Sequence, residues 1–254
     1  MNVKKKFQIL AGVIALIGML AILFVCIRKY MPSSQRMSSE EYFGQLGETE
    51  AAIVVEDHIA QEHAQIYDGN VYIDYTLVQN ELNSRFYWDA SVGLLLFTTP
   101  TQVFEIAPNT SAYAIDGESF DAGYDILHTT SAGMYLSMTF LQQYSDLNCQ
   151  VYETPKRVVI TYGSEEVTTA RIKKDTVVRY QGGIKSPIVT DVTEDSEVTV
   201  LEQMDSWSKV LTADGYIGYV KNKQLADVTQ TTRETVYAGP EYTSIHLDEK
   251  VNLV

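Results

Sequence analysis

Cysteine and histidine are scarce in this chain. It has two cysteines, Cys26 and Cys149, and four histidines among 254 residues. Cys26 lies inside a long apolar run and Cys149 lies far outside it, so the two cannot pair within one chain. A disulfide framework of the kind that stabilises small secreted domains is therefore excluded. Cys149 has no neighbouring cysteine or histidine, and we interpret it as a buried, inert thiol.

Motifs that carry catalysis are also missing. The sequence has no nucleophile elbow, phosphate-binding loop, zinc-binding helix or dinucleotide fingerprint. The adjacent glutamate pairs at positions 40–41 and 165–166 do not aim two carboxylates at one bond, as glycoside hydrolysis requires. His58 and His63 have no third ligand close by, and we interpret this stretch as a solvated polar connection. We therefore predict no catalytic residue, no metal and no cofactor for these residues.

Positive charge is scarce as well. The chain has 19 basic and 33 acidic residues, for a net charge of −14. Six of the basic residues flank the apolar run: Lys4, Lys5, Lys6, Arg28, Lys29 and Arg36. The rest of the chain therefore has 13 basic against 33 acidic residues, about −20. Such a surface repels nucleic acid and keeps an exported protein soluble, so we expect no nucleic-acid partner.

One apolar run dominates the N-terminus. Phe7 to Ile27 contains a single polar side chain, Gln8. As a helix this run would be about 30 Å long, which matches the hydrocarbon core of a bilayer. A cleaved signal peptide would have a shorter apolar region and a small-residue cleavage site, whereas Arg28 and Lys29 follow here. Lipidation of Cys26 requires a small residue directly before the cysteine, and Val25 is not small. A core helix of this length would have a polar face, and this run has none.

We therefore interpret residues 7–27 as an uncleaved transmembrane signal anchor in the lipid bilayer. Residues 1–6 form a cytoplasmic basic tail and residues 28–50 a polar tether. The numbers of basic residues on the two sides of the run are balanced, so they do not decide the orientation. We infer the orientation from the lengths of the segments before and after the run. The six residues before the run stay inside, and the C-terminal bulk is extracellular in a single-pass protein of the cell membrane.

An internal repeat follows the tether. Residues 71–98 read VYIDYTLVQNELNSRFYWDASVGLLLFT and residues 134–161 read MYLSMTFLQQYSDLNCQVYETPKRVVIT. They align without a gap at an offset of about 63 residues. Each copy predicts a strand, a short helix and a hairpin that ends in an apolar strand. One copy cannot bury its apolar face alone, so the two should pack as one domain.

The next segment predicts a small all-β barrel. Apolar residues alternate over 197–201, 207–211 and 216–220, and turn-rich stretches separate these segments. Asp214–Gly215 is itself a strong hairpin signal, because glycine adopts positive φ without cost.

The repeat resembles the copper amine oxidase N-terminal-like domain, a bacterial surface stalk. The resemblance covers about residues 66–162 and implies a repeat domain at 51–165. It rests on Tyr72, Val78, Leu82, Phe86, Trp88, Asp89 and the run LLLFTT. Despite its name the module is not known for copper chemistry, and no histidine triad is present here.

Residues 166–228 resemble bacterial SH3-like domains. The matching features are Arg179, the segment SPIVTDVTEDSEVTVL, Trp207 with Val210, Asp214–Gly215 and the tripeptide Gly218–Tyr219–Val220. Such modules bind peptide or peptidoglycan stems through an aromatic groove, which implies Tyr180, Trp207 and Tyr216 as ligand-binding residues. That Trp207 and Tyr216 belong to the barrel core, or that the barrel is only a spacer, stays open.

The last stretch, residues 229–254, is interpreted as a linker and the start of a downstream domain. The order of segments resembles the N-terminal part of membrane-anchored glycoside hydrolase family 18 proteins of Gram-positive bacteria, and KVNLV resembles the first strand of their catalytic barrel. The resemblance implies that this barrel follows Val254. The family's acidic motif DxxDxDxE is absent from the chain, so these residues are not an enzyme, while the activity of a longer protein stays open.

The expected fold is mainly β with short helices (α+β): an N-terminal transmembrane helix, a two-repeat stalk domain and a small SH3-like β-barrel. The expected function is the stalk and peptidoglycan-binding region of a glycoside hydrolase family 18-type cell-wall hydrolase. The alternative is a non-enzymatic surface structural or sensor protein whose repeat domain binds a partner.

Overall fold

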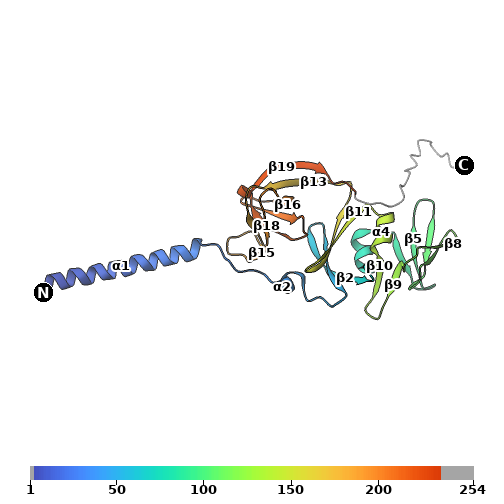
Figure 1. Cartoon of the computed structure of the whole chain (residues 1–254), viewed down its shortest axis with the longest axis horizontal. Helices are drawn as coiled ribbons and strands as arrows, with labels where there is room; N and C mark the ends of the chain where they lie inside the picture. Colours follow the sequence, from blue (N-terminus) through green and yellow to red (C-terminus); the bar gives the residue numbers. More distant parts are fainter. Residues whose placement is uncertain (1–2, 236–254) are drawn as a thin grey trace. The chain divides into compact units, whose positions relative to one another are not determined.

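The computed structural model describes residues 3–235, which are mainly β with one long N-terminal helix and a few short helices (Figure 1). The chain divides into two compact units. Unit 1 comprises Met1–Ser38 and Ala170–Val228, and unit 2 comprises Ser39–Thr169 and Thr229–Val254. Residues 236–254, which include the segment KVNLV, lie outside the described residues.

Unit 2 is built on a seven-stranded sheet. Its neighbouring strands are antiparallel except β1 and β12, which are parallel. In sheet order the strands are β11 (Leu147–Glu153), β12 (Lys156–Tyr162), β1 (Glu50–Val55), β2 (His58–Tyr67), β3 (Asn70–Asp74), β10 (Met134–Ser137) and β9 (Leu127–Thr129).

A second sheet of unit 2 is a five-stranded antiparallel meander. Its strands are β4 (Phe86–Asp89), β5 (Leu94–Thr98), β6 (Val103–Ile106), β7 (Ala112–Ile115) and β8 (Glu118–Asp121). The helices of the unit are α2 (Ser39–Phe43), α3 (Tyr75–Leu77), the one-turn π-helix η1 (Val78–Leu82) and α4 (Met138–Tyr144).

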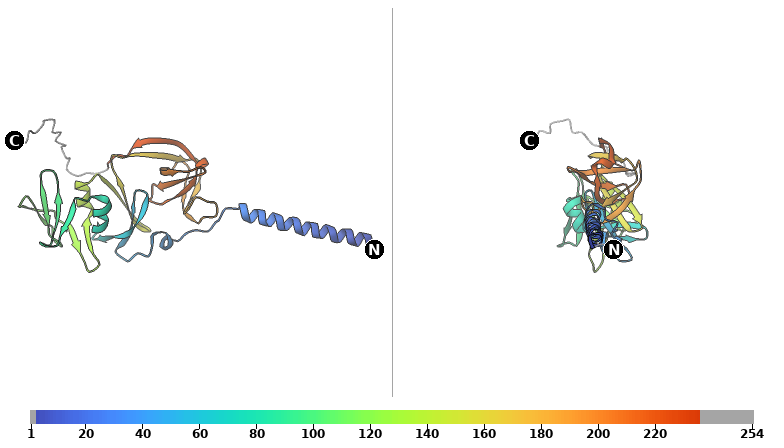
Figure 2. Two further views of the ribbon diagram at one scale, coloured as in Figure 1. Left: turned by 180° about the vertical axis from the view of Figure 1, so that it is seen from behind. Right: turned by 90° about the vertical axis from the view of Figure 1, so that its left-hand side faces the viewer.

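The predicted order of strand, helix and hairpin is confirmed in both copies of the repeat. The first copy runs β3, α3 with η1, β4 and β5, and the second runs β10, α4, β11 and β12. The first strands of the two copies pair antiparallel, and Ile73 lies opposite Leu136, its equivalent at the offset of 63. Equivalent residues facing each other indicate a local two-fold relation, with α4 packed against both strands (Figure 2).

The two copies differ in where their hairpins go. The hairpin β11–β12 extends the seven-stranded sheet through β1, whereas β4–β5 begins the meander. Phe86, Phe97, Phe104 and Phe140 are fully buried between these elements, and Phe86 and Phe97 stack at 4.3 Å. Aromatic rings thus join the repeat helices to the meander.

Two stretches of unit 2 differ from the sequence-based expectation. The interpretation of the segment with His58 and His63 as a solvated connection was wrong, because it forms β2 between β1 and β3. Its polar side chains alternate with inward-facing Ala64 and Ile66, and this alternation is the strand signal. Residues 99–133, for which no structure was predicted, contain β6 to β9.

Unit 1 contains a second seven-stranded sheet. In sheet order its strands are β15 (Ile188–Val192), β14 (Thr176–Arg179), β18 (Ile217–Lys221), β17 (Trp207–Thr212), β16 (Glu197–Gln203), β13 (Glu166–Ile172) and β19 (Leu225–Thr232), with the 3-10 turn η2 (Asn222–Gln224) before β19. The strands over 197–203, 207–212 and 217–221 confirm the predicted segments. Over the described residues the predicted barrel is not closed, because β15 and β19 are edge strands and do not pair.

Close backbone approach shapes the centre of this sheet. A Cβ at Gly218 of β18 would lie 2.5 Å from the Arg179 carbonyl oxygen and 2.6 Å from Val178 Cγ1. The turn after β17 has Gly215 at a φ of 82°, as the Asp214–Gly215 pair predicts. Glycine is therefore required at both positions. At 218 a side chain would not fit, and at 215 the backbone has a positive φ.

Helix α1 (Val3–Tyr30) contains the predicted apolar run. Its segment Leu10–Tyr30 is strongly apolar, and the most apolar 18-residue stretch of the segment has no buried residue. By length and composition it can cross a membrane, and an N-terminal signal sequence has the same properties.

The segment after α1, expected to be a polar tether, is hydrogen-bonded to unit 1. The Met37 amide donates to the Ile188 carbonyl at 2.8 Å, and the Ile188 amide donates to the Gln35 carbonyl at 2.8 Å. Arg36 forms a parallel bridge with Ile188 of β15. The segment Ser33–Met37 thus lies along the edge of the sheet beside β15, with one bridge at Arg36.

Candidate functional site

The candidate site of unit 1 lies at the open end of the hairpin β17–β18. Trp207 begins β17 and pairs with Lys221, the last residue of β18. The Lys221 Nζ lies 5.6 Å from the centroid of the Trp207 ring, within the range of a cation–π contact. Trp207 is half-buried, so part of its ring stays accessible to a ligand.

A cavity of about 180 Å³ lies beside this tryptophan. The loop after β14 closes against the ring, since a Cβ at Gly182 would lie 3.4 Å from Trp207 Cγ. The cavity is lined by Pro32, Thr176, Val177, Arg179, Ile184, Trp207, Lys221, Lys223 and Gln224. It is large enough for one side chain or a chain terminus, and smaller than a typical drug-sized pocket.

The lining of this cavity is cationic although the chain is strongly acidic. Arg179, Lys221 and Lys223 contribute to it, and no aspartate or glutamate does. Arg179 is 6% exposed, and burial lowers the pKa of its guanidinium, which nevertheless stays protonated at neutral pH. Its Nη1 donates to the Ser186 carbonyl at 2.6 Å and its Nη2 to the Ser33 carbonyl at 3.1 Å. Such a lining favours a carboxylate.

The three ligand-binding residues predicted from the sequence do not lie together. Trp207 lines the cavity, whereas Tyr216 lies at the turn end of the same hairpin, beside the Leu211–Ile217 pair. The two end residues of β17 are five residue steps apart along the strand, about 16 Å. Tyr180 follows β14, is 46% exposed and does not line the cavity. A single aromatic groove made of all three is therefore not formed.

Sequence reasoning missed the cationic residues of the site. Lys221 and Lys223 are surface lysines at the end of β18 and in η2, and nothing in their local sequence distinguishes them. The pairing of β17 with β18 brings Lys221 to the tryptophan. A tryptophan at the start of one hairpin strand and a lysine at the end of the next is the signal that could have been read.

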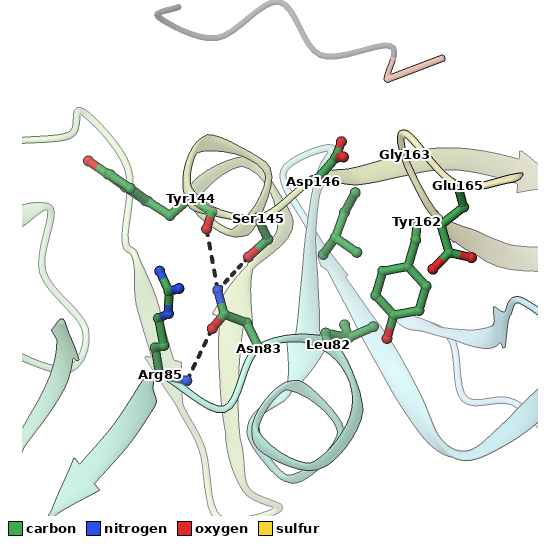
Figure 3. A pocket seen from close by; sticks show the side chains of 10 residues that line it. Leu82, Asn83, Arg85, Tyr144, Ser145, Asp146, Tyr162, Gly163 and Glu165 are labelled. Atoms are coloured by element: carbon green, nitrogen blue, oxygen red, sulfur yellow. Dashed lines mark hydrogen bonds between the residues drawn. The ribbon is translucent and has the colours of Figure 1, made fainter. Parts of the chain in front are cut away.

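A second cavity, of about 340 Å³, lies in unit 2 where the helices of the two repeats end (Figure 3). Asn83 follows η1, and its Nδ2 donates to the Tyr144 carbonyl at 3.3 Å and to Ser145 Oγ at 2.7 Å. Asn83 Oδ1 accepts from the Arg85 amide at 3.1 Å. These bonds tie the C-terminal end of one repeat helix to that of the other.

The lining of this second cavity mixes charges and aromatic rings. Arg85, Asp146 and Glu165 are among its lining residues, with Tyr144 and Tyr162. Asp146 Oδ1 accepts a hydrogen bond from Thr235, so part of the hydrogen-bonding capacity of the Asp146 carboxylate is used within the unit.

The part of the chain that the structure describes contains neither a cluster of metal ligands nor an activated thiol. Within residues 3–235 no group of three or more His, Cys, Asp or Glu side chains is arranged to hold a metal ion. Burial raises the pKa of the Cys149 thiol to about 12, so the reactive thiolate is rare at neutral pH. This is the environment of an inert structural cysteine.

Comparison with known families gives one match for this chain. Residues 174–226 match the bacterial SH3 domain family, and this region includes β14 to β18 and every lining residue of the Trp207 cavity except Pro32. Neither the curated proteins nor the solved structures gave a match. The chain thus contains a bacterial SH3 domain, a class whose members commonly bind cell-wall components.

Proposed function

We propose that this chain is a membrane-anchored extracellular protein of a Gram-positive bacterium, and that its SH3 domain binds the peptide stems of peptidoglycan. The observation that carries the proposal is the cationic cavity beside Trp207, whose lining residues all belong to the region that matches the SH3 family except Pro32. In this reading α1 holds the protein in the bilayer, and unit 2 and the part of unit 1 that follows α1 lie on the wall side.

The chemistry of the cavity supports a peptide ligand with a carboxylate. Peptide stems carry free carboxylates, which Arg179, Lys221 and Lys223 attract by charge-assisted hydrogen bonds. The Trp207 ring offers an apolar face to the aliphatic part of a short peptide. The glycan strands carry fewer charges and would not use the cations. The site therefore fits the peptide part of the wall better than the sugar part.

Sedimentation with isolated peptidoglycan tests this proposal on the full chain in detergent micelles. We expect the wild-type chain to sediment and Trp207→Ala to weaken binding at least tenfold, because a central aromatic anchor is removed. Lys221→Gln with Lys223→Gln should weaken binding too, more at low salt than at high salt. Tyr180→Ala is the matched control outside the cavity and should bind as the wild type does. A wild-type chain that stays in the supernatant at both salt concentrations refutes wall binding.

We propose further that unit 2 is a stalk and that the whole region serves a glycoside hydrolase family 18-type enzyme. The support is the resemblance of the repeat to the copper amine oxidase N-terminal-like stalk and of residues 229–254 to the linker before a catalytic barrel. The test is the coding sequence after the codon for Val254. A continuing frame that encodes DxxDxDxE supports the proposal, and a stop codon refutes it.

The alternative function is a non-enzymatic surface structural or sensor protein in which unit 2 binds the partner. The specific observation in its favour is the polar cavity at the junction of the repeat helices, with exposed Arg85 on its rim. Under this alternative Trp207→Ala has no effect on peptidoglycan sedimentation, and Arg85→Glu does not change it either.

A further inference from the structure

The juxtamembrane segment Ser33–Met37 follows the free edge of the SH3 domain. The Ser33 amide donates to the Ile184 carbonyl at 2.7 Å, which adds a third backbone bond to the two between this segment and Ile188. Strand β15 is an edge strand of its sheet, so its outer backbone groups would otherwise face solvent. The segment satisfies these groups as a peptide does when it adds a strand to a sheet edge.

Side chains hold the same segment at both ends. At its start, the buried Arg179 donates to the Ser33 carbonyl and Lys185 Nζ donates to the Met31 carbonyl at 2.6 Å. Near its end, Arg36 pairs with Asp191 of β15 at 2.7 Å. Both partners of this ion pair are more than half exposed, so we expect the backbone bonds and Arg179 to dominate.

Docking of the segment also places the preceding residue, Pro32, at the ligand cavity. Pro32, directly before the segment, lines the cavity with Trp207 and Lys221. The cavity keeps about 180 Å³ with the segment in place, so Pro32 is part of the wall of the cavity and the segment does not fill it. Arg179 contributes to the cavity and holds the segment at once, which links the two features through one side chain.

We propose that residues 33–37 are an integral edge strand of the SH3 domain and that Pro32 completes its ligand cavity. Ligand binding then requires the juxtamembrane segment to be docked, and a ligand in the cavity stabilises the docked state. This inference rests on the proposed binding of wall peptides. It assigns the segment between α1 and unit 2 to the binding site, although its sequence is that of a polar tether.

Hydrogen exchange and peptidoglycan sedimentation of the full chain in lipid nanodiscs test the two parts separately. Met37→Pro removes the amide that donates to Ile188. We expect the Ser33 and Ile188 amides to exchange at least tenfold faster in this variant, and peptidoglycan binding to fall severalfold. Ser34→Pro is the matched control, because the Ser34 amide makes no bond to β15, and it should change neither readout. Pro32→Ala should weaken binding and leave the exchange of these amides unchanged.

Three results overturn the inference. Ser33 and Ile188 amides that exchange in the wild type at the rate of an unfolded peptide exclude docking. Faster exchange in Met37→Pro with undiminished binding shows that the cavity does not need the segment. Protected amides in a wild-type chain that does not sediment with peptidoglycan refute the proposed function, and the ligand-linked part of the inference with it, while docking itself is still decided by the exchange data.

Discussion

In unit 2 the large aromatic side chains fill the core, whereas in the sheet of unit 1 they lie at or near the surface. The core of unit 2 includes four fully buried phenylalanines, and Phe140 contacts several other rings. The core of unit 1 is aliphatic and small, with Val178, Val210 and Val220 at its centre. Trp207 is only half-buried there and Tyr180 is 46% exposed.

This difference indicates that aromatic side chains mainly stabilise the fold in unit 2 and are accessible for binding in unit 1. Unit 2 buries its aromatic surface, and burial of rings contributes much of the free energy of folding of such a core. The SH3 domain has less apolar surface to bury and depends more on backbone pairing, including the hydrogen bonds of residues 33–37 to Ile184 and Ile188. In return its aromatic residues are available at the surface, where a ligand can reach them.

The largest expected effect is the loss of a core ring in unit 2. Phe140→Ala removes a fully buried ring whose centroid lies 4.8 Å from that of Tyr144 and 5.9 Å from that of Tyr113. We expect it to destabilise unit 2 by about 3–5 kcal/mol, the usual cost of such a cavity. Val210→Ala at the centre of unit 1 should cost only about 2 kcal/mol, because fewer carbons leave the core.

Hydrogen exchange at core amides measures both values in the full chain, with β3 and β10 reporting on unit 2 and β17 on unit 1. Equal costs for the two substitutions would show that the aromatic core of unit 2 contributes no more per side chain than the valine core, which contradicts the comparison.

The next effect concerns backbone packing in unit 1. Gly218→Ala places a methyl group within 2.6 Å of Arg179 and Val178 atoms, so β14 and β18 must move apart. We expect a loss of about 1–3 kcal/mol. Gly183→Ala is the matched control, because a Cβ there meets nothing within 4 Å. Thermal unfolding followed by circular dichroism separates the two, and equal melting temperatures would contradict the close approach of these strands.

The smallest effect is electrostatic and belongs to unit 2. Glu50 Oε2 accepts from the Gly47 amide at 2.8 Å, and this hydrogen bond, with a smaller contribution from His63, lowers the pKa of Glu50. A lowered pKa stabilises the folded state above the ordinary pKa of glutamate, and this stabilisation disappears as the pH falls through the folded value.

Glu50→Gln should therefore reduce the stability of unit 2 at pH 7 by about 1 kcal/mol or less, and the difference should shrink below about pH 4. Urea unfolding at a series of pH values measures it. Glu48→Gln, two residues away on the surface, is the control, and this substitution should leave the stability of unit 2 unchanged at every pH. A difference that grows toward acid pH would contradict the assigned hydrogen bond.

Much of the fold could be predicted because the signals are local. The repeat was visible since equivalent residues recur at one offset, and the strands of the SH3 domain were visible from alternation and turn residues. Strand β2 is hard to recognise because Glu62 interrupts the apolar face of Ala64 and Ile66, and Ile59 lies on the polar face. The meander strands β6 to β8 are four residues each, too short for a pattern to stand out.

The site was predictable only in part, for a different reason. Trp207 could be singled out by residue type, but Tyr180 and Tyr216 were grouped with it without knowledge of where the hairpin ends. The strand pairing places Lys221 beside the tryptophan and leaves Tyr216 at the other end. Pro32 and Lys221 are far apart in sequence, and no local pattern connects them.

The sequence by itself determined the apolar helix at the N-terminus, the two copies of strand, helix and hairpin, and the hairpins of the SH3 domain, because these follow from composition, periodicity and turn chemistry along the chain. Only the tertiary structure decided that the SH3 sheet stays open, that residues 33–37 pair with its edge, and that Pro32, Arg179 and Trp207 line one cavity. Each of these depends on backbone groups and side chains that are distant in sequence and meet only when the sheet has formed.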